Sequence, residues 1–261
     1  MKKIIDRIYL FLIFVFLYAP IVILVVFSFN NSKLRGSWAG FTLKWYKQLF
    51  NDPAILSSLW TTIFVAVVAT IISTVVGTIS AIAINELRGF KKDAILNINY
   101  LPVINPDIVT AVALMGLFGL FNIRMGYTTM IISHIVFCIP YVILSILPKL
   151  NQLQKNTLEA ALDLGATPTY AILHVVIPQI KPAILTGALM SFTLSIDDFV
   201  ISFFNTGQGV SNLSITIYSM ARKGINPSIN AVSTLMLVSL LILLVIINKR
   251  SEKNKKIEVE I

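Results

Sequence analysis

The stretch Asn151–Pro178, NQLQKNTLEAALDLGATPTYAILHVVIP, contains signals for two short helices separated by a turn. Asn156 is followed three residues later by Glu159, as in a capping box, which predicts that a helix begins near Thr157. Gly165 supplies the left-handed residue that often ends a helix. The first helix is therefore expected to occupy fewer than ten residues.

The second helix signal follows the turn directly. Thr167 is a suitable N-cap, and Pro168 suits the first helical position. This helix is expected to run through Tyr170–Ile177 until Pro178. Both helices are too short and too polar to cross a membrane.

Two interpretations of this helix pair stay open on pattern alone. It is either a surface loop packed on the membrane, or a docking element in which Ala160 and Ala161 let a partner approach closely. Glu159 and Asp163 form a like-charge pair at i,i+4, which mildly opposes the helix unless a partner or water offsets it. The apolar stripe of the first helix is expected to contain Leu158, Ala161, Leu162 and Leu164.

Outside this stretch the sequence is dominated by apolar segments. Apolar residues make up 56% of the 261 residues and charged residues only 13%, about half the usual share. A soluble enzyme, a disordered chain and a secreted scaffold are disfavoured. Six segments can cross about 30 Å of hydrocarbon as helices, at roughly 8–29, 57–84, 100–121, 127–148, 182–204 and 230–248. The first is too long for a signal-peptide core and lacks an Ala-x-Ala site, so we expect it to be retained.

The distribution of charge predicts the orientation of these spans. The N-terminus, the second and fourth loops and the tail hold 14 of the 21 basic residues, and the other three loops hold 7. The positive-inside rule therefore places both termini in the cytoplasm. The net charge of +9 is then a topology signal and not a sign of nucleic-acid binding. Aromatic residues of the first outer loop are expected at the membrane interface, namely Trp38, Trp45, Tyr46 and Phe50.

The cytoplasmic stretch carries a family resemblance. Glu159-Ala160-Ala161, Gly165 and Pro178 resemble the EAA motif, E-A-A-x3-G-x9-I-x-L-P, of membrane subunits of bacterial ABC importers. In that family the segment forms a coupling helix that sits in a cleft of the cytoplasmic ATPase. The resemblance implies that Glu159, Ala160, Ala161 and Gly165 form the docking helix and its turn. Two positions differ conservatively from the pattern, at Val175 and Ile177.

The likeness extends over nearly the full chain. Stretches near the N-terminus resemble the start of polyamine permeases: Leu17–Pro20, Phe27–Asn30 and Gly40–Tyr46. Later stretches are similar to the C-type permease subunit of spermidine/putrescine importers: Pro106–Val109, Ser133–Ile135, Ser191–Asp198 and Ile217–Met220. The resemblance implies an all-α integral membrane protein with the type I ABC importer permease fold. It would have six transmembrane helices in a single permease domain, 1–261, and a cytoplasmic coupling segment, 151–178, between spans 4 and 5.

The resemblance also implies partners and a location. The sequence has no P-loop, so ATP and Mg are expected on separate ATPase subunits, with no cofactor or metal bound by this non-catalytic chain. The expected partners are a second permease subunit, two ATPase subunits and an extracytoplasmic polyamine-binding protein, with no nucleic acid. The expected location is the bacterial cytoplasmic (inner) membrane. The alternatives are a permease for iron(III), sulfate or thiamine, or an ion-driven secondary transporter.

Acidic residues within predicted spans are costly and mark candidate functional sites. Asp197 and Asp198 lie toward the outer half of the fifth span, about 100° apart around a helix. Phe199 and Phe203 provide nearby ring faces. A path for polyamines needs carboxylates for the ammonium groups and aromatic faces for the cations and methylenes. The alternative is that both acids cap helices or pair structurally.

Other polar and small residues of the spans favour structural roles. Asp107 follows Pro106, where the third span should break, and we favour a first-turn acid over a pathway residue. His134 is expected to make a helix–helix hydrogen bond and not to relay protons. Four glycines within the spans are expected at close packing contacts: Gly77, Gly116, Gly119 and Gly187.

Overall fold

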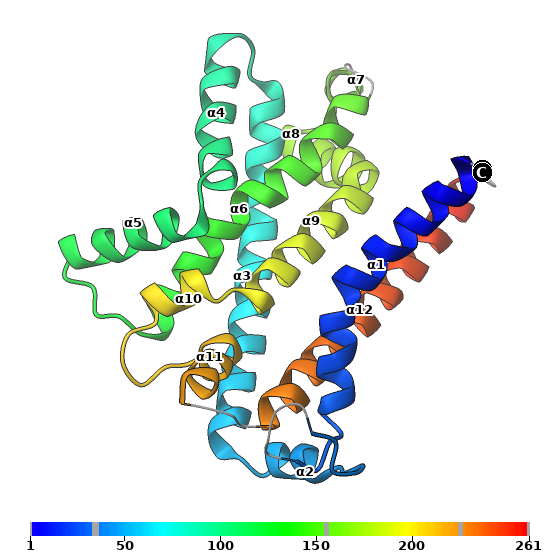
Figure 1. Ribbon diagram of the computed structural model, residues 1–261. Helices are drawn as coiled ribbons and strands as arrows, with labels where there is room; N and C mark the ends of the chain where they lie inside the picture. The colour runs from blue at the N-terminus through cyan, green and yellow to red at the C-terminus, as the bar shows by residue number, and fades with distance from the viewer. Residues whose placement is uncertain (1, 33–36, 154–156, 224–226, 260–261) are drawn as a thin grey trace. The chain divides into compact units, whose positions relative to one another are not determined.

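The computed structural model describes residues 2–32, 37–153, 157–223 and 227–259, and the elements in them are helices (Figure 1). The expected cap Asn156 lies outside the described residues. The contacts divide the chain into two compact units, Met1–Ser57 with Thr216–Ile261, and Ser58–Ile215.

The first unit is built from α1 (Lys2–Phe27), α2 (Lys44–Phe50) and α12 (Ser228–Val259), and α12 contacts both others. The loop before α2 is folded back on itself, with an antiparallel bridge between Asn30 and Phe41. Trp45 is 3% exposed, and its Nε1 donates to the carbonyl of Asn30 at 2.7 Å. Trp45 is therefore packed inside the loop, and its place at the membrane interface stays a prediction.

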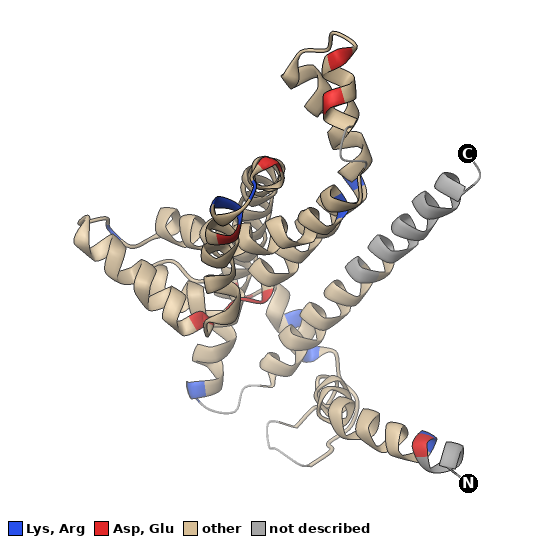
Figure 2. Cartoon of the chain, turned by 90° about the horizontal axis from the view of Figure 1, so that it is seen from above, with Lys and Arg blue, Asp and Glu red and all other residues tan. Residues whose placement is uncertain are grey.

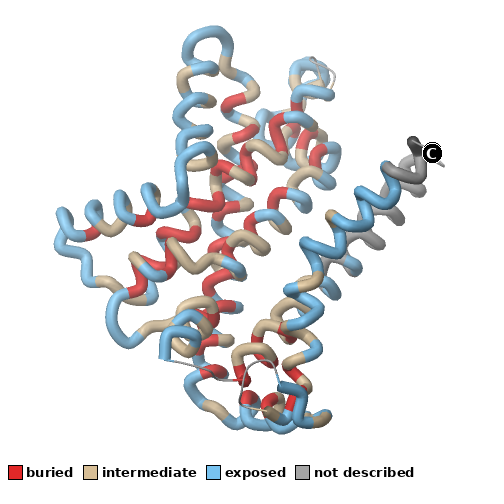
Figure 3. The backbone as a smooth tube through the Cα atoms, in the orientation of Figure 1, coloured by how far each residue is buried: buried red, intermediate tan, exposed pale blue. Residues whose placement is uncertain are grey.

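The second unit contains the remaining helices: α3 (Pro53–Glu86), α4 (Phe90–Ile104), α5 (Asp107–Leu120), α6 (Tyr127–Gln152), α7 (Thr157–Asp163), α8 (Pro168–Ala171), the π-helix η1 (Ile172–Val176), α9 (Ile177–Asp197), α10 (Val200–Asn205) and α11 (Leu213–Lys223), although α3 and α11 each extend across the unit boundary. Buried residues follow α6 along its length, and α3 and α9 also contribute to its core (Figure 3).

Two glycines allow this close packing. A Cβ atom at Gly77 of α3 would lie 2.7 Å from Cγ1 of Val142 on α6, and one at Gly187 of α9 would lie 3.3 Å from the same atom. Val142 is itself fully buried. The prediction of close packing is confirmed for Gly77 and Gly187. It is wrong for Gly116 and Gly119, which have nothing within 4 Å of a Cβ atom.

Four helices in the described residues are long and apolar enough to span a membrane: Asp6–Phe27, Pro53–Glu86, Tyr127–Gln152 and Pro168–Asp197. The pair α4 and α5 makes a fifth if it is one broken span, bent by 106°. This bend confirms the predicted break before Pro106. Ser228–Ile242 of α12 is apolar but shorter than a full span, so the number six stays a prediction.

The predicted fifth span, 182–204, differs from the observed helices. Continuous helix begins at Pro168 and ends at Asp197, and α10 follows after a break at Asp198. Pro178 therefore does not end the second cytoplasmic helix. The π-helix η1 lies just before it, where the N–H of Ile177 bonds to the carbonyl of Ile172. Such a widened turn relieves the clash that a proline ring otherwise makes with the preceding turn.

Candidate functional site

The predicted docking element consists of α7 and a tight turn. The described part of α7 runs from Thr157 to Asp163, directly after residues that lie outside the description, so its predicted start near Thr157 stays a prediction. Gly165 has φ +87°, its N–H donates to the carbonyl of Leu162 at 2.9 Å, and the N–H of Ala166 donates to that of Ala161 at 3.1 Å. These two bonds form a Schellman motif, which requires a left-handed residue at Gly165. Local sequence rules therefore determine where α7 ends.

Most side chains of this element face away from the protein. Glu159 and Ala160 are exposed and Ala161 is half-buried. Leu158 packs against the core cluster of α3, α6 and α9. The expectation that Leu164 shares this apolar stripe is wrong, because it is 90% exposed at the end of α7. Leu162 is also exposed, so the element presents two acids, one alanine and two leucines on its surface: Glu159, Asp163, Ala160, Leu162 and Leu164.

A hollow of about 540 Å³ lies beside α7. Its lining combines Glu159 with two basic residues, Arg88 of the α3–α4 connection and Lys92 of α4, and with apolar residues from the ends of α3 and α6. The turn after α7 then leads into α8, where Thr167 is the N-cap. Its Oγ1 accepts from the N–H of Tyr170 at 3.4 Å, with Pro168 at the first helical position. The predicted start of the second helix is confirmed.

The adjacent acids at the far end of this helix differ in their surroundings. Asp197 is the last residue of α9 and is exposed. The side chain of Asp198 is only 5% exposed. Asp198 has an extended backbone, with ψ 128°, which turns its carboxylate toward the start of α10. The interruption of the helix between α9 and α10 separates the two carboxylates. The expected 100° rotation along one continuous helix does not apply here.

Asp198 holds the N-terminus of α10. Its Oδ1 accepts from the N–H of Ile201 at 3.0 Å, and its Oδ2 accepts from the N–H of Ser202 at 2.7 Å and from the Ser202 hydroxyl at 2.8 Å. Charge-assisted bonds of this kind are about twice as strong as neutral ones. The carboxylate therefore satisfies the backbone donors that the helix break exposes.

Buried polar side chains from other elements surround this cap. His134 of α6 is 1% exposed; its Nδ1 lies 2.7 Å from the Ser195 hydroxyl and its Nε2 lies 2.9 Å from the Ser202 hydroxyl. Asn212 donates through Nδ2 to the Ser202 hydroxyl at 2.8 Å and to the carbonyl of Asp198 at 3.1 Å. The predicted helix–helix hydrogen bond of His134 is confirmed.

A second polar contact joins α10 to the broken span. Asn205 is fully buried, and its Nδ2 donates to the carbonyl of Ala111 on α5 at 3.2 Å. The main-chain carbonyl of Asn205 accepts a hydrogen bond from the Thr129 hydroxyl of α6 at 2.7 Å. The short helix α10 is thus fixed to both α5 and α6. These contacts place the end of α10 beside α5, within the second half of the third predicted span.

The remaining candidates lie around the break. Phe199 and Phe203 have ring centroids 5.2 Å apart, and Phe203 is 46% exposed. Asp107 is exposed in the first turn of α5. A negative charge at this place interacts favourably with the helix dipole and stabilises the helix. The structure thus brings Asp197, Asp198 and the two rings into one region. Figure 2 shows the few acidic and basic residues at helix ends and in connections, with long uncharged stretches between them.

Sequence reasoning missed the residues that hold this region together: Ser195, Ser202, Asn205 and Asn212. Short polar side chains are common in apolar helices, where they bond to the preceding turn, so their presence alone predicts no network. The available signal was their clustering within fifteen residues of the two adjacent acids.

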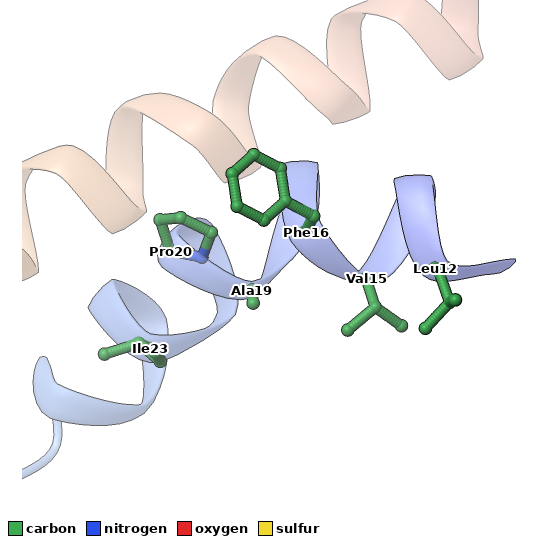
Figure 4. Close-up of a pocket in the computed structure, with 6 residues that line it drawn as sticks. All are labelled: Leu12, Val15, Phe16, Ala19, Pro20 and Ile23. Atoms are coloured by element: carbon green, nitrogen blue, oxygen red, sulfur yellow. The ribbon is translucent and has the colours of Figure 1, made fainter. Parts of the chain in front are cut away.

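A separate hollow lies along α1 and is unsuited to a charged ligand. Its lining residues all come from that helix and are apolar (Figure 4): Leu12, Val15, Phe16, Ala19, Pro20 and Ile23. None of these six residues has a carboxylate, and together they form no aromatic cage. A surface of this kind suits lipid or another apolar helix.

Known proteins resemble this chain in sequence and fold. Residues 73–256 match the family described as binding-protein-dependent transport system inner membrane component. The spermidine/putrescine transport system permease protein PotC of Haemophilus influenzae is 36% identical over 246 residues, which cover 94% of this chain and 96% of that protein. The putrescine transport system permease protein PotI of Escherichia coli K12 is 37% identical over 231 residues, covering 86% and 82%. A bacterial ABC transporter involved in alginate import has a chain with a TM-score of 0.73 at 18% identity, covering 97% and 94%.

Proposed function

The chain belongs to the family of binding-protein-dependent transport system inner membrane components, the non-catalytic membrane subunits of ABC importers, and we propose that it translocates spermidine or putrescine. The observation that carries this proposal is the similarity to polyamine permeases along nearly the whole chain. Such similarity includes both the docking segment and the acidic break, not one motif alone.

The region of the break has the chemistry that this cargo needs. Polyamines carry several ammonium groups on a flexible methylene chain. Asp197 is an exposed carboxylate at a helix end, and Phe203 is a partly exposed ring a short distance along the chain. A carboxylate and an aromatic face together attract an organic cation. We propose that Asp197, Phe199 and Phe203 contact the cargo, that Asp107 stabilises the start of α5 and is not on the path, and that Asp198 supports the region.

The docking segment supports ATP-driven transport over an ion-driven mechanism. Glu159 and Ala160 are exposed on the short helix α7, and Leu164 is exposed in the Schellman turn that ends it. In our proposal, Glu159–Ala161 and the turn at Gly165 dock on an ATPase subunit, with Pro178 inside the helix that follows. An ion-driven carrier has no evident need for such an element.

The rest of the assembly follows from this role. A second permease subunit would pair with this chain, two ATPase subunits would bind ATP and Mg, and an extracytoplasmic binding protein would deliver polyamine. We propose six membrane crossings, with α4 and α5 forming one of them and α12 the last. Both termini would lie in the cytoplasm, as the basic residues predict.

Reconstitution tests the proposed function. The chain should be purified with its partner subunits, inserted into proteoliposomes and supplied with the binding protein and ATP. We expect uptake of radiolabelled spermidine or putrescine and ATP hydrolysis that the loaded binding protein stimulates. Sulfate, thiamine and iron(III), each with its own binding protein, serve as controls for cargo. Uptake of one of these instead of a polyamine, or uptake by the chain alone, would refute the proposal.

A further inference from the structure

His134 lies at the centre of the buried polar network, and the proposed transport step assigns it no role. It comes from α6, whereas its partners come from α9 and α10. Its ring therefore bridges the two helices on either side of the break at Asp198. A buried histidine in this place has a protonation state that the surrounding hydrogen bonds determine.

The Ser202 hydroxyl has one proton and two lone pairs. The hydroxyl donates its hydrogen bond to Oδ2 of Asp198, because a carboxylate can only accept. One lone pair receives the N–H of Asn212. The other is left for His134 Nε2, at 2.9 Å, so Nε2 must bear a proton. The Nε2–Asp198 Oδ2 distance of 3.5 Å is too long for a good direct hydrogen bond.

The other ring nitrogen then accepts. In the neutral ring only one nitrogen bears a proton. Nδ1 therefore accepts a hydrogen bond from the Ser195 hydroxyl at 2.7 Å. In this state every described bond between His134, Ser195, Ser202, Asn212 and Asp198 has one donor and one acceptor. A doubly protonated ring would turn Nδ1 into a donor and force the Ser195 hydroxyl to find another acceptor.

We infer that His134, as the neutral Nε2–H tautomer, is a positioning residue that ties Ser195 to Ser202 across the break and so keeps the Asp198 carboxylate on the start of α10. Asp198 is then committed to the cap, and Asp197 is the carboxylate of the pair that stays open to a cation. This inference rests on the proposed polyamine function for its transport consequences, but not for the tautomer.

The tautomer is tested without transport. The chain has two histidines, so His174→Gln leaves His134 as the single signal. The full chain, labelled with ¹⁵N-histidine and placed in lipid nanodiscs, is measured by NMR at neutral pH. We expect a protonated Nε2 and an unprotonated Nδ1. A protonated Nδ1, alone or together with a protonated Nε2, would overturn the inference.

The positioning role is tested with the reconstituted importer. His134→Phe removes both ring bonds and should lower polyamine uptake about tenfold, a factor that corresponds to about 1.4 kcal/mol. His134→Gln keeps a donor toward Ser202 and should recover part of that rate. If His134 acts through Asp198, the double variant His134→Phe/Asp198→Asn should be no slower than Asp198→Asn, because residues in one network are not additive.

The matched control is another buried hydrogen bond of the same unit. Ser73 of α3 bonds to the Ser191 hydroxyl of α9 at 2.8 Å, so Ser73→Ala also removes one interhelical bond. Its effect should multiply with that of Asp198→Asn. Multiplicative loss for His134→Phe as well, or a wild-type rate for Asp198→Asn, would overturn the positioning role. If the wild-type importer moves no polyamine, the proposed function fails, and the NMR measurement still decides the tautomer.

Discussion

Replacing Gly165 should separate ATP hydrolysis from transport. The residue has φ +87°, where a side chain costs roughly 1–2 kcal/mol and a β-branched one costs more. Nothing lies within 4 Å of the position a Cβ atom would take, so the whole penalty is backbone strain. A cost of about 1–2 kcal/mol changes the population of the native turn by a factor of about 5–30. Gly165→Val should therefore raise the ratio of non-native to native turn by a factor of about 5–30, and α7 is misaligned with its proposed docking partner whenever the turn is not native.

The assay is the ratio of ATP hydrolysed to polyamine imported in proteoliposomes. For Gly165→Val we expect this ratio to rise several-fold, and for Gly165→Asn we expect little change because asparagine tolerates left-handed backbone. Gly40 is the matched control: it has φ +95° and open space around it, but lies in the other unit. Gly40→Val should lower stability and leave the ratio unchanged. An unchanged ratio in Gly165→Val, or an equal rise in Gly40→Val, would refute the reasoning.

Three further outcomes are expected. Gly77→Ala should lower the midpoint of thermal unfolding by overpacking, at a cost of about 1–3 kcal/mol, and Val142→Ala should restore part of it by removing the Cγ atom 2.7 Å away. Glu159→Arg should abolish substrate-stimulated ATPase activity while membrane insertion, measured by fractionation, stays intact. Asp197→Asn should reduce uptake with an unchanged unfolding midpoint, whereas Asp198→Asn should lower that midpoint because it weakens three hydrogen bonds at a buried cap.

Each of these outcomes has a control. Gly116→Ala adds the same methyl group where nothing lies within 4 Å, so an equal loss of stability there would exclude overpacking at Gly77. Asp163→Asn is the control for Glu159→Arg, because it changes charge on the same short helix. Full activity of Glu159→Arg would argue against docking through the Glu159 side chain. A wild-type uptake rate in Asp197→Asn would remove Asp197 from the path.

The features that were predictable from sequence are those that neighbouring residues determine. The turn at Gly165 and the start of α8 at Thr167 and Pro168 follow from capping rules and were found as predicted. The break before Pro106 follows from the missing N–H of proline. The family, and with it the all-α membrane class, was also predicted correctly.

The features that were missed depend on residues far apart in the chain. No proline or glycine marks the break at Asp198, which instead relies on bonds to Ser202 and Asn212 and on the bridge through His134. Trp45 is buried because its indole N–H finds a carbonyl fifteen residues away. Pro178 is a local exception: the π-helical turn directly before it accommodates the ring, and capping rules do not predict such a turn. Periodicity and local capping rules contain no information about such partners.

The two candidate regions are connected by one helical run. The turn at Gly165 opens directly into the helix that begins at Pro168, and that helix continues for 30 residues to Asp197, a length of about 45 Å at 1.5 Å per residue. If a partner moves α7, the run transmits the displacement to the acidic break without any flexible connection. At that end, α9 is tied to α6 through His134, and α10 is tied to α5 through Asn205. A shift of the proposed docking element would therefore strain the bonds that keep Asp198 on its cap, which would link the proposed docking end of the chain to the proposed cation-binding end.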